Sequence, residues 1–265
     1  MPIISRRVLG IALLLAQSSF AVDLSAGANK ASLVAQVKSA PSESEMEVLH
    51  SIALTRRGSG AKNNPTYGAW WNAKKAAEQL ARQGAIDELE SLSRDPSTTV
   101  AAAAIEGLRT SPPSARVVAI LRSAIRRGGR PRDAALRLLD NQGPAAVAAV
   151  PELLSVAKEQ NADRVLALQC LKRLGPAAAS AVPTVARLLA PKGLFLDEIA
   201  ETLAALGPVG VKALVKAMKS PDKEVRDAAY HMGSDLDDLE AKAAAREIDG
   251  SYSVETLRSA DANTR

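Results

Sequence analysis

Apolar residues recur at every third or fourth position along most of the chain, which is the spacing of one face of an α-helix. This helical pattern is itself repeated. Gly143-Pro144, Gly175-Pro176 and Gly207-Pro208 follow one another at intervals of 32 residues, and Pro112 lies another 32 residues upstream. A fixed period of this length predicts an array of helical repeats. No stretch alternates apolar and polar residues over a useful length, so an all-α fold is expected.

Each repeat is predicted to be a helical hairpin with four apolar positions, which lie 6, 9, 24 and 27 residues after the proline of Gly-Pro. The first two positions belong to the first helix of the hairpin, and the last two belong to the second helix. The expected core residues are Val118, Val150, Val182, Leu214, Leu121, Leu153, Val185, Ala217, Leu136, Leu168, Ala200, Met232, Leu139, Leu171 and Leu203.

The Gly-Pro dipeptide is expected to end one helix and begin the next. Glycine accepts the backbone dihedrals that terminate a helix, and proline at the first helical position wastes no hydrogen bond. Pro151 and Pro183 lie seven residues further on. They are predicted to bend the first helix of their hairpins, because an internal proline removes a backbone hydrogen bond.

Three segments carry a resemblance to a known family. The run from Leu174 to Pro183 (LGPAAASAVP) resembles the first helix of short bacterial HEAT repeats, the kind named after phycobilisome lyases. The runs from Asp95 to Ile105 and from Pro221 to Ala229 are similar to the beginning of the second helix of those repeats. The resemblance covers roughly residues 84–236. It implies a right-handed α–α superhelical solenoid of HEAT-like hairpins whose second helices line the concave side.

The chain is expected to divide into four parts. Residues 1–21 are predicted to be a signal peptide, because two arginines precede a short apolar run and Ser19-Phe20-Ala21 fits a cleavage site. Residues 22–41 are interpreted as a linker that includes a short helix near Ala31 to Lys38. Residues 42–250 form the repeat domain, and residues 251–265 form a flexible tail. The expected location is the periplasm or the exterior of the cell, by either the general or the twin-arginine route.

Three smaller features interrupt or end the repeat domain. Residues 57–68 are rich in glycine and asparagine and are predicted to be a loop, after which Trp70-Trp71 begin a helix that runs to Gly84. The second helix of the last repeat is expected to end near Gly233. A polar helix from Leu236 to Ile248 is then predicted to cap the array.

Residues that could perform catalysis are few. The chain has two histidines, His50 and His231, and one cysteine, Cys170, none of them in a metal-binding spacing. Cys170 stands between apolar residues and is expected to be buried. The chain contains no Gly-x-Ser-x-Gly elbow and no phosphate-binding loop. The sequence therefore predicts a protein without an enzymatic activity, a metal or a cofactor.

One repeat is strongly basic. Between Arg109 and Asp140 there are eight arginines and two aspartates, whereas the whole chain has a net charge of +5. Arginines in this number either bind an anionic partner or form a solvated face whose acidic partners, such as Glu106 or Glu152, come from neighbouring repeats. The candidate binding residues in this repeat are Arg122, Arg126, Arg127, Arg130, Arg132 and Arg137.

A second candidate surface is a row on the second helices. The residues that follow the core positions Ile105, Leu136, Leu168 and Ala200 are Glu106, Arg137, Gln169 and Glu201, and an alignment of Val225 with Val100 adds His231 to this row. This row should face solvent if its neighbours are buried. Its mixed charges suit a protein or peptide partner, so Gln169 and Glu201 are added to the candidate binding residues.

Three functions remain open at this stage. The first is a non-enzymatic exported scaffold that binds a protein or peptide. The second is binding of nucleic acid or another phosphate-bearing partner through the arginine-rich repeat, which export and scarce aromatic residues disfavour. The third is a lyase-like enzyme or enzyme accessory, which the resemblance to bilin-attaching lyases suggests. No transmembrane span is expected, and the sequence defines no oligomeric state.

Overall fold

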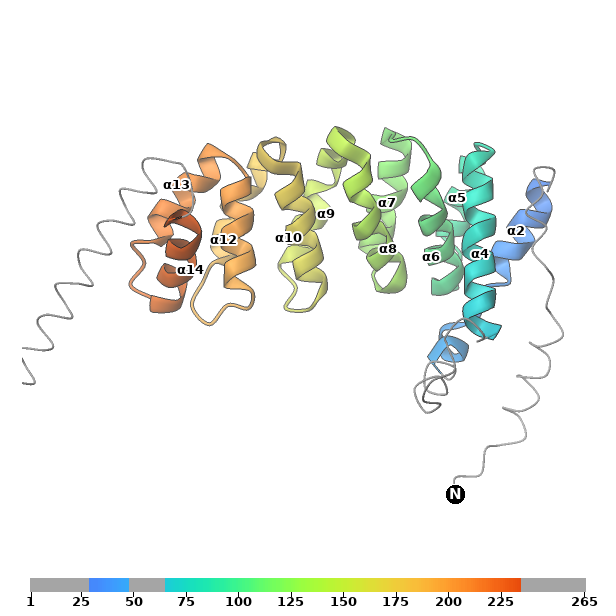
Figure 1. Ribbon diagram of the computed structural model, residues 1–265, viewed down its shortest axis with the longest axis horizontal. Coiled ribbons are helices and arrows are strands. Elements are labelled where there is room, and N and C mark those ends of the chain that lie inside the picture. Colours follow the sequence, from blue (N-terminus) through green and yellow to red (C-terminus); the bar gives the residue numbers. More distant parts are fainter. Residues whose placement is uncertain (1–28, 48–64, 235–265) are drawn as a thin grey trace, which may run out of the picture. The chain divides into compact units, whose positions relative to one another are not determined.

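The computed structural model describes residues 29–47 and 65–234 (Figure 1). Every regular element in these ranges is a helix, which confirms the all-α prediction. None of the described helices is long and apolar enough to cross a membrane. The predicted signal peptide, the capping helix at 236–248 and the tail lie outside the described residues, as does most of the predicted 57–68 loop.

The chain divides into two units, residues 1–141 and 142–265, which are described separately. The helices of the first unit are α2 (Lys30–Lys38), α4 (Pro65–Arg82), α5 (Ile86–Ser93), α6 (Thr98–Gly107), η2 (Leu108–Thr110), α7 (Ala115–Arg127) and α8 (Gly129–Leu139). The 3-10 segment η3 (Asp140–Ala149) begins at the junction. The second unit continues with α9 (Val150–Ala157), α10 (Asp163–Leu174), η4 (Gly175–Ala181), α11 (Val182–Leu188), α12 (Leu196–Ala205), α13 (Pro208–Ala217) and α14 (Lys223–Ser234).

Within each unit the helices pack in two layers. In the first unit α4, α6 and α8 pack side by side, while α5 and α7 form the other layer (Figure 1). In the second unit α10, α12 and α14 form one layer, and α9, α11 and α13 form the other. The layer of α10, α12 and α14 consists of the second helices of successive hairpins. Each unit is therefore built from helical hairpins that stack on their neighbours in sequence.

The predicted core positions are buried in almost every case. Thirteen of the fifteen expose less than a tenth of their surface, from Val118 in α7 to Leu214 in α13. The two exceptions, Ala217 and Met232, are half-buried and belong to the last described repeat. A terminal repeat has a neighbour on one side only, so its apolar positions are covered less completely.

The prolines act differently from the prediction. Pro151 and Pro183 do not bend a continuous α-helix. Each stands at the start of a new α-helix, α9 or α11, and the preceding segment is 3-10. The α-helical hydrogen bond that proline lacks is not needed in the first turn, so the chain changes helix type just before it. In the next repeat the same position is Val215, and α13 runs from Pro208 to Ala217 without a break.

Of two N-terminal helices, one begins earlier than expected and the other lies where the sequence predicted a short helix, near Ala31 to Lys38. The helix that was predicted to begin at Trp70 begins at Pro65, so residues 65–68 of the predicted loop are helical. Proline is favoured at this first position because its nitrogen carries no hydrogen to satisfy. The linker segment contains α2, whose buried Leu33 and Val37 belong to a helix packed on α4. Part of this segment is therefore folded against the repeats.

Candidate functional site

The predicted row on the second helices is solvent-accessible in the second unit. Gln169 on α10 and His231 on α14 are exposed, and Glu201 on α12 is half-buried. Lys172 Nζ lies 2.9 Å from Glu201 Oε1, and this ion pair joins α10 to α12. Because the three helices pack in order, the row extends over consecutive hairpins.

A hollow of about 320 Å³ lies on this layer between α12 and α14. The α12 side contributes Asp197, Glu198 and Glu201, and the α14 side contributes Ala228, His231 and Met232. Asp197 and Glu198 make no side-chain hydrogen bond or ion pair with any residue in the described part of the chain. The sequence predicted Glu201 and His231 as surface residues but did not indicate that three acidic residues line one side of a hollow.

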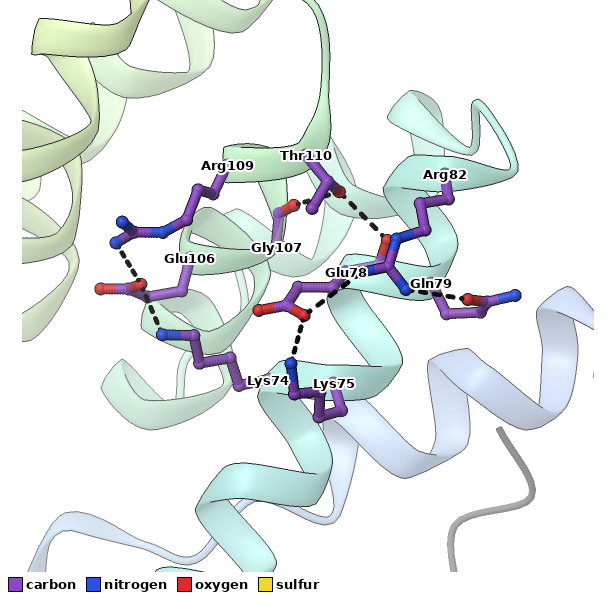
Figure 2. A network of polar contacts seen from close by, with 9 residues as sticks. All are labelled: Lys74, Lys75, Glu78, Gln79, Arg82, Glu106, Gly107, Arg109 and Thr110. Atoms are coloured by element: carbon purple, nitrogen blue, oxygen red, sulfur yellow. Dashed lines mark hydrogen bonds and ion pairs between the residues drawn. The ribbon is translucent and has the colours of Figure 1, made fainter. Parts of the chain in front are cut away.

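The first member of the row behaves differently, because Glu106 is withdrawn from solvent by its partners. Glu106 Oε2 lies 3.0 Å from Lys74 Nζ on α4 and 3.1 Å from Arg109 Nη2 (Figure 2). Its side chain is 15 % exposed, so it is a link between α4 and α6 and not an available contact. Arg137, the next member, is exposed and lies 3.6 Å from Asp133 one turn earlier.

Figure 2 shows a second set of contacts on α4 that the sequence did not suggest. Glu78 is buried, with Lys75 Nζ at 2.8 Å and Arg82 Nη2 at 3.8 Å from Oε2. Thr110 Oγ1 lies 3.2 Å from the carbonyl oxygens of both Glu78 and Gly107. The ion pairs of Glu78 lie within α4, whereas the two contacts of Thr110 in η2 fasten the end of α6 to the middle of α4. The only sign of these contacts in the sequence was Glu78 itself, an acidic residue within an alanine-rich helical segment.

Two arginines of the basic repeat, Arg116 and Arg130, have acidic partners from elsewhere in the first unit. Arg116 on α7 donates to Asp87 and Glu90 on α5, with Arg116 Nη2 3.0 Å from Glu90 Oε2. The hydrogen bond from Arg116 lowers the pKa of Glu90, partial burial opposes it, and Arg94 adds to the lowering. Arg130 Nε lies 3.3 Å from Glu43 Oε1. Much of the positive charge of this repeat is therefore balanced within the first unit.

Other arginines of this repeat support the backbone. Arg127 donates from Nη1 to the carbonyl oxygen of Ser93 at 3.2 Å and from Nη2 to that of Pro96 at 3.0 Å. Arg132 Nε donates to the carbonyl oxygen of Ile125 at 3.0 Å. Both arginines therefore bind helix-end or loop carbonyls. The two remaining candidates lie on α7, where Arg122 is half-buried and Arg126 is exposed.

The contact made by Arg132 recurs in the second unit. Arg164, near the start of α10, donates to the carbonyl oxygen of Lys158 in its own hairpin and to that of Leu194 in the next. Arg226 on α14 donates to the carbonyl oxygen of Ser220 at 2.9 Å. Arg132 and Arg164 are one repeat period apart, and all three arginines stand in the first turns of a second helix. This arginine position ties the second helix to the turn that precedes it.

An exposed aromatic pair marks the N-terminal half of α4. Tyr67 is 55 % exposed and Trp71 is 49 % exposed, one helical turn apart. The ammonium groups of Lys74 and Lys75 lie 5.8 Å and 5.0 Å from the centre of the Trp71 ring, within the range of cation–π attraction. Both lysines are also engaged by Glu106 and Glu78.

Within the described residues, no group of three or more histidine, cysteine or acidic side chains is arranged to hold a metal ion. Cys170 is buried on α10, as its apolar neighbours predicted. No protein-family model matches this chain, and no curated protein matches it either.

Proposed function

We propose that this chain is an exported helical-repeat scaffold that binds a protein or peptide partner and catalyses no reaction. In this proposal short HEAT-type hairpins form a right-handed α–α solenoid over residues 42–250. The 32-residue period and the two-layered packing of consecutive hairpins support the architecture. Stacked hairpins present extended surfaces, and repeat proteins use such surfaces to bind other proteins.

The observation that carries the proposal is the accessible row on α10, α12 and α14. Gln169, Glu201 and His231 lie on three adjacent helices, and Glu201 and His231 also line a hollow. The mixture of amide, carboxylate and imidazole groups suits the polar and charged groups of a polypeptide. The alternative is an anionic partner bound by the basic repeat. It has weaker support, because Arg116, Arg130 and Arg137 each face a carboxylate of this chain.

Site-specific photo-cross-linking tests which layer binds. A photoreactive amino acid at Gln169, on the second-helix layer, is compared with the same group at Lys212, an exposed position on α13 in the other layer. We expect a protein from the exported fraction of the native host to cross-link mainly from position 169, and mass spectrometry then identifies it. Equal cross-linking from position 212 would place the interface elsewhere. The absence of any specific adduct from both positions would count against the scaffold function.

Export is the second part of the proposal and depends on residues 1–21. Cleavage after Ala21 would leave Val22 at the N-terminus of the mature protein. N-terminal sequencing of protein isolated from the native host is the direct measurement. Cytosolic protein that retains Met1 or Pro2 would contradict export.

A further inference from the structure

The hollow between α12 and α14 combines two chemically different walls. Asp197, Glu198 and Glu201 line the acidic side, whereas apolar Ala228 and Met232 line the other side together with His231. Its volume of about 320 Å³ lies within the range of binding sites for small ligands. A cavity with acidic groups beside apolar surface matches a side chain that has an apolar stem and a positively charged head, and lysine and arginine are such side chains.

The carboxylates of the hollow differ in how they are engaged. Glu201 is paired with Lys172 at 2.9 Å. Asp197 and Glu198 have no side-chain partner among the described residues. Both stand in the first turn of α12, where acidic residues are favoured by the helix dipole. The dipole accounts for acidic residues at 197 and 198, but it accounts neither for Glu201 in the next turn nor for the hollow that α14 completes.

We propose that this hollow receives a lysine or arginine side chain of the partner protein. The inference rests on the proposed scaffold function and adds the chemistry of the segment that binds. Three carboxylates gather here in a chain whose net charge is +5. Charge complementarity of this kind selects partners and orients them more than it raises affinity. A basic segment is therefore favoured over an acidic or a neutral one.

The test uses the full chain and a fluorescein-labelled peptide in which three lysines alternate with serine and glycine. A matched peptide with glutamate in place of lysine is the specificity control. Binding is followed by fluorescence anisotropy at about 50 mM salt, where exposed charges are screened less than at physiological ionic strength. The hollow variant is Asp197→Asn with Glu198→Gln, because both changes keep the shape of the side chain. The matched control is Glu47→Gln with Glu224→Gln, two exposed acids outside the hollow whose loss changes the net charge equally.

We expect the lysine peptide to bind at least tenfold more tightly than the glutamate peptide. The hollow variant should bind the lysine peptide at least tenfold more weakly than the wild-type chain, and the matched control should differ from wild type by less than twofold. Equal weakening in both variants would overturn the inference, because it would show attraction to net charge alone. Failure of the wild-type chain to bind the lysine peptide would overturn it as well.

Two further measurements separate this inference from the scaffold function. If the hollow variant still cross-links the natural partner from position 169 and keeps its affinity for the lysine peptide, the hollow is not the site and the scaffold function stands. If the wild-type chain cross-links no partner, the scaffold function itself fails. Analytical ultracentrifugation of the wild-type chain and the hollow variant tests whether a second copy of this chain occupies the hollow. If the wild-type chain forms dimers and the hollow variant is a monomer, the occupant is a second copy of this chain and the assignment to a different protein is overturned.

Discussion

Gly107 on α6 lies directly against Ala77 on α4. A Cβ atom on Gly107 would be 2.5 Å from the Cβ of Ala77 and 2.6 Å from its carbonyl carbon, closer than side chains approach in folded proteins. The absence of a side chain at Gly107 therefore sets the distance between the two helices. The polar contacts of Figure 2 lie beside this crossing, because Thr110 bridges the carbonyl oxygens of Gly107 and Glu78.

Gly107→Ala should destabilise the protein even though alanine favours helices. The added methyl group has to displace the backbone of α4, and overpacking of this kind costs about 1–3 kcal/mol. Gly68→Ala is the matched control, because Gly68 is exposed within α4 and an added Cβ meets nothing within 4 Å. That change should stabilise by up to about 1 kcal/mol. Urea unfolding followed by circular dichroism measures both, and an unchanged midpoint for Gly107→Ala would contradict the close crossing.

Leu171→Ala should produce a large loss of stability from the middle of the second unit. Leu171 on α10 is fully buried, and truncation of a buried leucine leaves a cavity that costs about 2–5 kcal/mol. Leu194→Ala removes the same atoms from a side chain that is 48 % exposed, so we expect a much smaller change. A loss below about 0.5 kcal/mol for Leu171→Ala, the range of surface substitutions, would show that the repeat register is wrong.

The hairpins and most of their core could be predicted because each repeat supplies the same information several times. A single apolar residue such as Val150 is ambiguous, but Val118 and Val182 stand at the same position of adjacent repeats. The change from 3-10 to α-helix before Pro151 was not predicted. The helical period indicates which face is buried, and it does not distinguish one helix type from the other over a single turn.

The charged contacts could not be predicted, because their partners are far apart in the sequence. Arg116 pairs with Glu90, 26 residues earlier, and Arg130 pairs with Glu43, 87 residues earlier. The net charge of a short sequence segment does not show which charged residues pair after folding. The hollow between α12 and α14 was missed for the same reason: its acids are visible in the sequence, but the gap depends on how Ala228 and Met232 pack.

The contact between Arg116 and Glu90 should make the stability of the protein depend on pH in the acidic range. The pKa of Glu90 in the folded chain is lowered from its ordinary value of about 4.5, chiefly by the hydrogen bond from Arg116. A lowered pKa contributes stability that is present above the unfolded value and is lost as the pH falls through the folded value. Glu90→Gln should therefore be less stable than wild type at neutral pH, and the difference should shrink on acidification below about pH 4.5. Arg116→Gln should behave similarly when thermal melts are recorded across this pH range. A difference in stability from wild type that stays constant with pH would exclude the linkage.

The last prediction separates a structural role from a binding role for the basic repeat. Arg127→Gln removes the donors that reach the carbonyl oxygens of Ser93 and Pro96 in the preceding hairpin. Because Arg127 is exposed, we expect a loss of about 1–2 kcal/mol, less than the full contribution of two charged hydrogen bonds. Arg137→Gln removes an equal charge from a side chain that is 60 % exposed and pairs only at 3.6 Å with Asp133, so stability should fall by less than about 0.5 kcal/mol.

The two variants then distinguish the alternatives when a short DNA duplex serves as the anionic probe. If arginines of this repeat hold an anionic partner, each substitution should weaken binding and reduce its dependence on salt, since each removes one phosphate contact. Equal DNA affinity in wild type, Arg127→Gln and Arg137→Gln, together with a lower melting temperature for Arg127→Gln alone, would assign Arg127 to the fold. We expect this second pattern, because the donors of Arg127 already meet backbone carbonyls and those of Arg116 and Arg130 already meet carboxylates.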